Sequence, residues 1–584
     1  MTELGEEALE VAAVVEPDAG ISVEVDPRER RRVLIAWGVL GVAFVAAMWS
    51  RRWISDDGFI NLRIVDNLLG GHGPVFNVGE RVEAGTSQLW LVLLAVPQAL
   101  LGRLVDAEWL AVFVGLACSA GAVALAVAAQ WRTWRGPVVP LAVLAWLPLG
   151  AVWDFSSSGL EGPLLWLWTA GSFGALAVRA VDQDRRDPWR PWWLPVLLGL
   201  GPLIRPDATL YSVAFLAVLL LVSERSWRGA LRSLVLAVAA PAAYEVFRMG
   251  FFGALVPNTA LAKEAGGSEW GTGGRYLLDF LLDGWLWIPV AALVAVAVLV
   301  VRSGAVRRPL LLLWAVSGGA ALVHAAWVVR VGGDFMHARL LLGDWFLLLL
   351  PLWALPADVL RRLPVRAGAV GLAVLVVWGA SAWVVARQPL HSPVADGVVD
   401  ERTNYSWAAE HPHPVTIEDH GANAWTRWGL DARERAAAGR DVVLLPRTNR
   451  SMRSIPAGRE GTAIVWPNIG LLGYAAGPGV HVIDPIGLSD AFAARMEALP
   501  GARVGHAKDM PLAWVEARFG LAGEATEDAD LAGRALSCPA LQELQNTIAA
   551  PMTPQQFVRN VLRAPSLTLL SIPRNPHVAV NELC

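Results

Sequence analysis

Residues 51–87 read RRWISDDGFINLRIVDNLLGGHGPVFNVGERVEAGTS, and this first polar stretch organises the rest of the chain. It follows an apolar run at 33–49 and places two adjacent acids, Asp56 and Asp57, within a few residues of that run. At 59–71, apolar side chains recur at helical spacing with polar side chains beside them. We therefore expect an amphipathic helix that lies on a membrane surface and holds the two acids at its start.

The composition is that of a polytopic membrane protein. The chain has 584 residues, 55% of them hydrophobic, with 29 Trp and a mean hydropathy of +0.45. A soluble protein this apolar has too few polar groups to cover its surface. Several apolar runs approach the ~20 residues that a helix needs to cross a bilayer. The net charge of −4 argues against a nucleic-acid partner.

Three regions are predicted. Residues 1–32 form an acidic tail without apolar pattern, which we expect to be disordered and cytoplasmic. Residues 33–388 form a transmembrane domain, and residues 389–584 form a mixed α/β domain. In the latter, buried strands are expected at 441–446, 462–467 and 480–484, and helices near 490–499 and 539–549. The apolar runs after the first lie at 88–104, 109–130, 137–152, 163–181, 191–204, 207–222, 229–247, 284–301, 309–329, 339–357 and 366–386.

Loop charge predicts the orientation of the spans. Five loops are basic and are therefore expected in the cytoplasm: WRTWRG (131–136), RRDPWR (185–190), SERSWRG (223–229), RSGAVRR (302–308) and RRLPVR (361–366). The loops that alternate with them, together with Asp56, Asp57 and the region after 389, then fall outside. Because 88–130 must supply one net crossing, we expect 88–104 to lie in the outer leaflet or fold back. About eleven transmembrane helices result.

The paired acids offer an acid–base centre. Two adjacent carboxylates in a partly apolar setting disfavour joint ionisation, so one of them can keep a raised pKa and act as a base on a hydroxyl. A structural alternative for Asp56 and Asp57 is helix capping after Ser55, or ion pairing with a nearby arginine such as Arg63.

Cations collect in the other external loops. Arg205 lies in LIRPDA, Lys263 follows PNTALA, and Arg339 ends GGDFMHAR two residues after His337. Arginine binds phosphate bidentately and lysine binds it as a point charge, so the set suits a lipid phosphate. Snorkelling to the interface is the structural alternative for each one. His324, inside the run at 309–329, is interpreted as a packed core histidine.

The cysteines leave two alternatives open. Cys118 lies in an apolar run and is expected to pack there, whereas Cys538 and Cys584 fall in the polar C-terminal region. If that region is extracytoplasmic, the latter two form either a disulfide or a pair of free thiols. The sequence contains no CxxC or HExxH motif, so no cofactor is predicted, and a divalent-metal requirement stays undetermined.

Residues 53–87 resemble the first external loop of the terminal β-(1→2)-arabinofuranosyltransferases of the actinobacterial cell envelope, which are membrane glycosyltransferases of GT-C type. Further similarity to that family and its relatives lies in SSGLEGPL (157–164), LIRPDA (203–208), LVPNTALAK (255–263), VGGDFMHAR (331–339), GLLGYAAGPGVHVIDPIGLSD (470–490) and RVGHAKDMP (503–511). The resemblance covers residues 30 to 584. It implies a GT-C transmembrane domain in the plasma membrane and an extracytoplasmic domain with glycan binding as a candidate role.

The resemblance also implies a reaction. The donor would be decaprenyl-phosphate arabinofuranose, and the acceptor would be the non-reducing ends of arabinan in arabinogalactan or lipoarabinomannan. It assigns catalysis to Asp56 and Asp57, with Asp56 as the leading candidate. The expected substrate-binding residues are Arg63, Glu83, Glu161, Arg205, Asp207, Asn258, Lys263, Asp334, His337 and Arg339.

Several alternatives stay open. Donor and product are both β-linked in that family, so Asp56 acts either as a base, as a nucleophile or as a group that orients the acceptor. A second enzyme hypothesis keeps the fold and uses polyprenyl-phosphate mannose. Two non-enzymatic hypotheses are a transporter of polyprenyl-linked glycans and a wall-anchoring protein. A transporter would place charges at the bilayer midplane, whereas here they fall in external loops.

Overall fold

The computed structural model describes residues 27–181, 192–223, 226–263, 268–362, 365–385, 394–395, 397–448, 451–500, 502, 505–520 and 526–584. Most of the predicted tail at 1–32 and the whole basic loop at 185–190 lie outside these residues. The end of that tail belongs to a helix, because α1 begins at Pro27.

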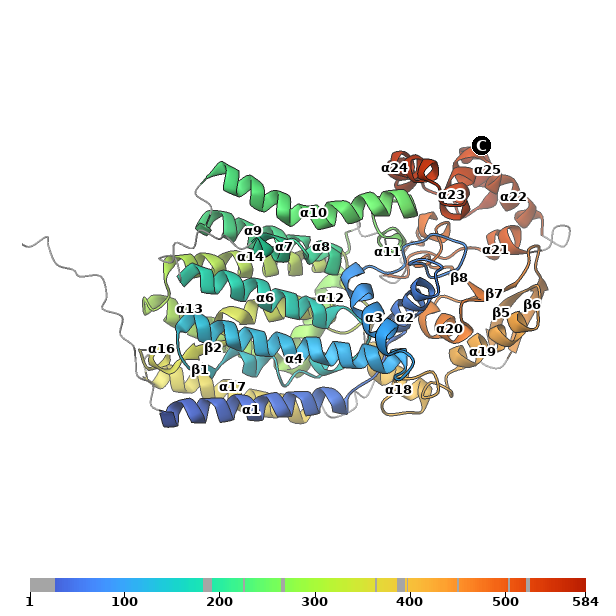
Figure 1. Ribbon diagram of the computed structural model, residues 1–584. Helices are drawn as coiled ribbons and strands as arrows, with labels where there is room; N and C mark the ends of the chain where they lie inside the picture. Colours follow the sequence, from blue (N-terminus) through green and yellow to red (C-terminus); the bar gives the residue numbers. More distant parts are fainter. Residues whose placement is uncertain are drawn as a thin grey trace, which may run out of the picture.

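A bundle of long, roughly parallel helices forms one half of the molecule, and a smaller α/β region forms the other half (Figure 1). Among the described residues, five helices are long and apolar enough to cross a membrane, or six if the bent pair α12–α13 is one span. They are α1 (Pro27–Ser50), α4 (Ala107–Trp134), α6 (Gly162–Val181), α10 (Trp227–Phe252) and α14 (Arg308–Arg330), with α12 (Trp270–Leu282) and α13 (Trp287–Arg302) joined by η3 (Asp283–Trp285). The prediction of a membrane protein is thereby supported.

Shorter segments complete the bundle. The run at 191–204 is divided into α7 (Trp193–Leu198) and α8 (Gly201–Ile204), and it leads through η2 (Pro206–Ala208) into α9 (Thr209–Ser223). The run at 339–357 is likewise divided into α15 (Leu341–Leu349), η4 (Leu350–Leu352) and β2 (Ala354–Pro356). Three further helices in this part of the chain are α11 (Asn258–Ala262), α16 (Ala357–Arg362) and α17 (Val365–Val385).

The apolar run at 137–152 does not form one helix. It forms β1 (Val138–Pro140), η1 (Ala142–Ala145) and the start of α5 (Gly150–Phe155). Pro137, Pro140 and Pro148 lack the amide hydrogen that a helix interior needs, which explains the interruption. β1 pairs antiparallel with β2, and the Leu141 amide donates to the Trp353 carbonyl, so neighbouring backbone satisfies part of this segment.

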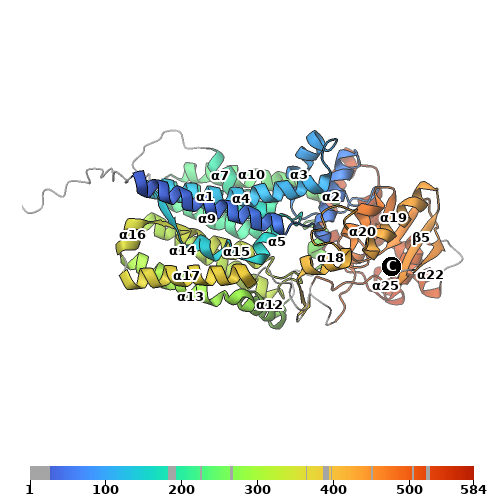
Figure 2. The ribbon, with the colours of Figure 1, turned by 90° about the horizontal axis from the view of Figure 1, so that it is seen from below.

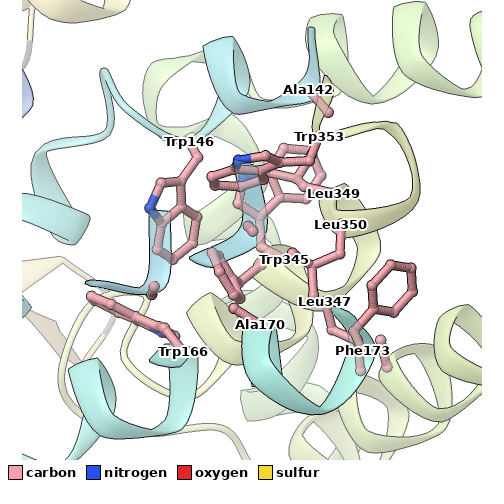
Figure 3. Packing of buried hydrophobic residues seen from close by; sticks show 14 of the residues in the cluster. Ala142, Trp146, Trp166, Ala170, Phe173, Trp345, Leu347, Leu349, Leu350 and Trp353 are labelled. Carbon is pink, nitrogen blue, oxygen red and sulfur yellow. The ribbon is translucent and has the colours of Figure 1, made fainter. Parts of the chain in front are cut away.

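Large aromatic side chains fill the space around these interrupted segments (Figure 3). The rings of Trp146 and Trp166 meet edge to face with centroids 4.9 Å apart, and Trp353 packs against Phe346. The indole N–H of Trp345 donates to the Ala145 carbonyl at 3.1 Å. These contacts bury the irregular backbone inside protein, where polar groups without a helical partner are tolerated.

Helix α3 (Gln88–Leu101) accounts for the extra apolar run near the N-terminus. Its 14 residues, interrupted by Pro97, fall short of the ~20 that a crossing needs. A turn after Leu101 leads directly into α4, and α3 packs against α4 and α2 (Asp56–Leu69). Val96 and Leu100 remain exposed on its outer side. α3 is therefore a short helix that folds back onto the bundle.

The C-terminal region contains a mixed four-stranded sheet of order β6-β5-β7-β8. β5 (Val442–Thr448) pairs antiparallel with β6 (Ser451–Pro456) and parallel with β7 (Thr462–Val465), which pairs parallel with β8 (Val480–Ile483). The three stretches predicted as strands are thus β5, β7 and β8. The helices here are α18 (Glu401–Ala409), α19 (Ala424–Ala437), α20 (Ile469–Ala476), α21 (Leu512–Phe519), α22 (Glu527–Leu536), α23 (Pro539–Ala549), α24 (Pro554–Thr568) and α25 (Pro576–Leu583).

Three smaller features complete this region. β3 (Val394–Ala395) and β4 (Val398–Val399) pair antiparallel, and the expected helix near 490–499 is only the single turn η5 (Ala493–Arg495). The structure joins Cys538 and Cys584 by a disulfide, which ties α25 to the start of α23.

Helix α2 binds both ends of α20. The Asp56 carboxylate accepts hydrogen bonds from the amides of Gly470 and Leu471 at the start of α20. Two helical turns later, the buried Arg63 guanidinium donates to the carbonyls of Gly473 and Gly477 at its end. An anion at the N-terminus and a cation at the C-terminus both match the helix dipole. A Cβ atom at Gly470 would lie 1.8 Å from the Asp56 carbonyl oxygen, so this close approach requires glycine.

Arg63→Met is expected to destabilise this junction strongly. The Arg63 guanidinium also donates to the carbonyls of Phe76 and Val480 at 2.8 Å, and the substitution leaves these buried acceptors without a donor. Each unsatisfied carbonyl costs roughly 1–3 kcal/mol, so the loss should be about 3 kcal/mol or more. The thermal unfolding midpoint in detergent, followed by tryptophan fluorescence, measures it.

The unfolding midpoint of Arg63→Lys should lie between those of the native chain and Arg63→Met, because the lysine ammonium replaces part of the lost set of hydrogen-bond donors. Arg435→Met is the matched control, since the Arg435 side chain is 41% exposed and pairs with Asp431 on its own helix. Equal unfolding midpoints for Arg63→Met and Arg435→Met would contradict the structural role of Arg63.

Candidate active site

The two acids of the first loop have different surroundings. Ser55 caps α2, because its hydroxyl accepts the Gly58 amide hydrogen bond at 3.0 Å. The Asp56 side chain is therefore free to leave its own helix. Its oxygens accept from the Gly470 amide at 3.1 Å and from the Leu471 amide at 2.8 Å. Asp56 is only 5% exposed, at the boundary between the bundle and the C-terminal region.

Burial sets the protonation of Asp56. Loss of solvation favours the neutral acid and raises the pKa of Asp56 from 3.8 to about 7. The amide hydrogen bond from Leu471 opposes this shift, the neighbouring Asp57 charge adds to it, and the Gly470 amide opposes it again. A carboxyl group with a pKa near neutrality can either hold or release a proton under ordinary conditions.

Asp57, Arg339 and Asp334 form a line of charges, in which each side chain pairs with the next. Asp57 Oδ2 accepts from Arg339 Nη1 at 2.9 Å, and Arg339 Nε lies 3.4 Å from Asp334 Oδ2. The Asp57 side chain keeps 22% of its surface exposed, more than Asp334 or Arg339. The predicted residues Asp57, Asp334 and Arg339 therefore meet, although they come from loops 277 or more positions apart in the sequence.

Glu401 is a further acid of this cluster that the sequence did not single out. It lies in the first turn of α18 and is buried, and its Oε2 has no hydrogen-bond partner among the residues that the structure describes. Burial, followed by the charges of Asp57 and Asp56, raises the pKa of Glu401 well above its usual range. The surroundings of Glu401 therefore favour its neutral form. Nothing in the linker sequence VVDERTNY marks it as special.

A second line of charges lies deeper in the bundle. Arg205 Nη1 donates to Glu161 Oε1 at 2.9 Å. Its Nε and Nη2 donate to the two Asp207 carboxylate oxygens at 2.9 and 2.7 Å. Asp207 in turn lies 3.2 Å from His324. His324 and Tyr211 both bind the Asp344 carboxylate, at 2.9 and 2.5 Å.

His324 is buried, as expected of a core histidine, and it also has two carboxylate neighbours that the sequence did not indicate. Asp207 comes from a different apolar run and Asp344 from another, so no local pattern around His324 indicates them.

Two cavities lie beside these groups and share one lining residue. The first is narrow and lies within the bundle, lined by polar side chains of both lines of charges, namely Glu161, Arg205, Asp207, Tyr211, His324 and Arg339. The second, of about 100 Å³, lies at the end of α1 and is lined by Arg51, Asp154, His337, Glu401 and Arg402, with apolar side chains opposite them. Phe155 contributes to both cavities.

Three other predicted site residues lie apart from this centre, and a fourth, His337, lies at the second cavity. Arg63 serves the carbonyls around α20, and its burial lowers its pKa to about 9. Glu83 pairs with Arg248 at 2.7 Å and accepts from the Tyr244 hydroxyl. Asn258 donates to the carbonyls of Gly487 and Asp490, and so links α11 to the C-terminal region. His337 lines the second cavity and binds Asp279 at 2.6 Å.

Lys263 is different from the other cations. Its side chain is half-buried near the loop that carries Arg339, because a Cβ atom at Gly505 would lie within 4.0 Å of both Lys263 and Phe335. Among the described residues it has no ion-pair partner, whereas Arg205 and Arg339 are each held by two carboxylates. Within the same part of the chain, no three His, Cys, Asp or Glu side chains are placed to hold a metal ion.

The chain is similar in sequence to one family model and to two named proteins. Residues 439–578 match the model of the AftB family C-terminal domain. A protein of Mycobacterium tuberculosis (strain ATCC 25618 / H37Rv) named terminal β-(1→2)-arabinofuranosyltransferase is 32% identical over 93% of this chain and 94% of its own length. A protein of the same name from Corynebacterium glutamicum is 34% identical over 93% of this chain and 86% of its own. No solved structure matches the chain significantly.

Asp56 is expected to titrate near neutrality. As the pH rises through about 7, the neutral carboxyl group should ionise, because its pKa is raised and not lowered by the site. Infrared difference spectra of the purified protein should show the protonated carboxyl band decreasing with that midpoint. Asp56→Asn should remove this component, whereas Asp66→Asn on the exposed side of α2 should leave it unchanged. A band that is already lost at pH 5 would show that Asp56 is ionised in the fold.

Proposed function

The chain belongs to the family of terminal β-(1→2)-arabinofuranosyltransferases, and from that premise we propose that it transfers arabinofuranosyl groups to cell-wall arabinan at the site that contains Asp56 and Asp57. It is a membrane glycosyltransferase. The observation that carries the proposed site is the meeting of Asp56, Asp57, Asp334 and Arg339 at the end of the helix bundle. These residues come from two of the loops that most resemble the family.

Asp56 is the proposed catalytic carboxylate. A pKa of about 7 suits a group that takes a proton from an acceptor hydroxyl, since the ionised form is available without excessive basicity. The backbone amides of α20 hold both of its oxygens and thereby fix its direction. The same carboxylate, when ionised, also suits a nucleophilic role, which a reaction with net retention at the anomeric carbon would require.

Asp57 and Arg339 are proposed to complete the centre. Arg339 compensates part of the local negative charge, and Asp57 keeps an exposed edge toward the substrate space. Glu401, held neutral, can donate a hydrogen bond where an ionised acid cannot. A carboxyl donor beside a carboxylate acceptor is suited to binding sugar hydroxyls, which need both kinds of partner.

The donor is proposed to be decaprenyl-phosphate arabinofuranose, with its phosphate bound by Lys263 and Arg339. The position of Lys263 supports this donor. Its side chain lies near the loop that carries Arg339, and no carboxylate among the described residues pairs with it. The donor tail would remain in the membrane beside the bundle. The acceptor would be a non-reducing end of arabinan in arabinogalactan or lipoarabinomannan. A mannosyl donor is the second enzyme candidate.

We further infer a GT-C architecture with eleven crossings in the plasma membrane, the C-terminal region outside. Three contacts support this count. The Arg51–Asp154 pair brings the end of α1 to α5, and the Arg205–Glu161 pair brings η2 to the start of α6. The β1–β2 pairing joins residues 138–140 to 354–356 on the opposite side of the bundle. When these interrupted segments are counted as crossings together with the continuous helices, the total number of crossings is odd.

Asp56→Asn should fold normally and lose transfer to an arabinan oligosaccharide. The loss should be on the order of 10²–10⁴-fold, the usual contribution of a positioned acid–base group. The amide of asparagine keeps one oxygen acceptor for α20 and loses the other, so the unfolding midpoint should fall and activity is assayed well below it. Asp66→Asn, on the same helix, is the control and should retain activity. Native rates for Asp56→Asn would contradict the proposed role.

Lys263→Met should weaken donor binding selectively. Loss of one charge-assisted phosphate contact is worth roughly 1.5–3 kcal/mol, so the KM for the donor should rise about tenfold or more while kcat changes little. Steady-state assays with decaprenyl-phosphate arabinofuranose and with the mannose analogue test this and separate the two donors. Arg275→Met, which removes an exposed cation of α12, is the control. An unchanged KM would exclude Lys263 from the donor site.

A further inference from the structure

Helix α24 has an apolar stripe that the protein itself does not cover. Its side chains Val558 and Leu562, and Leu569 directly after its last residue, are 58%, 75% and 84% exposed. Together with the exposed Pro565 they occupy positions i, i+4, i+7 and i+11, which fall on one side of an α-helix. A soluble surface rarely presents such an ordered apolar stripe without a partner.

The opposite side of α24 fixes the helix to the rest of the chain. Asn560 is buried and donates from Nδ2 to the Gly250 carbonyl of α10 at 2.9 Å. Phe557 packs so closely on the same helix that a Cβ atom at Gly250 would overlap its ring. The stripe is therefore displayed by a firmly attached helix and is not the exposed side of a loose segment.

The position of α24 relates the stripe to the membrane. α10 is one of the helices long enough to cross a bilayer, and only 11% of its apolar window is buried, so most of it faces lipid. α24 lies beside the end of α10, toward the outer side of the bundle (Figure 1). Val238 and Val246 on α10 are also exposed, so apolar surface is present on both helices.

A basic edge borders the stripe. Arg559 and Arg563, both exposed, share one acid, because each of them pairs with Glu543 on α23. Two cations with one anion leave a net positive charge beside the apolar side chains. A helix with an exposed apolar side and basic residues at its margin is typical of segments that lie in the headgroup region of a bilayer.

We propose that α24 is an interfacial helix that inserts Val558, Leu562 and Leu569 into the membrane surface at the end of α10, with Arg559 and Arg563 facing anionic headgroups. The bilayer is favoured over a second copy of the chain as the occupant. A stable protein interface takes about 20–30 residues on each side, whereas the stripe contributes four positions of one helix. The helix would set the distance of the C-terminal region from the lipid surface.

A single fluorophore tests the proposal in the full chain. Cys118 is buried and Cys538 and Cys584 are disulfide-bonded, so Leu562→Cys introduces the accessible thiol for an environment-sensitive label. In nanodiscs of mixed neutral and anionic lipid, its emission should shift to the blue and resist quenching by aqueous iodide. The matched control is Asp530→Cys, which places the label on exposed α22 in the C-terminal region.

Three results would overturn the proposal. They are equal emission from the two labelled positions in nanodiscs, iodide quenching of Leu562→Cys as strong as that of Asp530→Cys, and a blue shift that appears in detergent only as protein concentration rises, which would indicate a second copy.

The charge contribution is tested with the Arg559→Gln/Arg563→Gln variant of the labelled chain, which should lose the increase in protection that anionic lipid adds. Because these side chains are exposed, the unfolding midpoint should stay unchanged. Protection that is the same with and without anionic lipid in the native chain would overturn the headgroup contact.

Discussion

The packing of α2 against α20 is the contact on which the rest of the molecule depends. Phe59 and Leu62 of α2 lie in the same buried cluster as Leu471 and Leu472 of α20. The two ionic groups of α2 sit at the two ends of α20, where the backbone offers unpaired amides and carbonyls. The loop that carries Asp56 and the C-terminal region are thus packed together at this point, and both contribute to the proposed site.

This arrangement also explains how several acids can lie close together without all being ionised. Asp57 and Asp334 both pair with Arg339, and the charge of Asp57 acts on both Asp56 and Glu401, so full ionisation of these four acids would leave a large negative charge. The raised pKa values of Asp56 and Glu401 reduce that charge. A phosphate donor would add more negative charge, which is why a cation without its own carboxylate partner matters. Lys263 is the described residue that meets this requirement near the site.

The sequence predicted elements where one local pattern controls the structure. Apolar length indicated the long helices, and short apolar runs between glycine and proline indicated β5, β7 and β8. The prediction from apolar length was wrong at 137–152. Composition suggested a crossing helix there, but three prolines remove amide hydrogens that a helix interior needs.

Among the site residues, motif-like loops pointed to Asp57, Asp334 and Arg339, which the fold brings together. Glu401 and Asp344 were missed, and so was the pairing of Asp207 with His324, because these roles arise only from tertiary contacts. Arg63 shows the opposite case. It lies in the most family-like loop, yet its hydrogen bonds all serve the protein backbone and one neighbouring amide side chain.

The interrupted crossings explain how polar chemistry is built into an apolar bundle. A continuous helix satisfies its own backbone and turns only side chains outward, whereas a broken segment can end inside the protein and turn its polar residues inward. α5 ends at Asp154 and Phe155, α8 ends at Arg205, and the loop before α15 carries Arg339. All three ends line the two cavities. The prolines and glycines that break these helices therefore locate the site, because they release the chain where charged groups must converge.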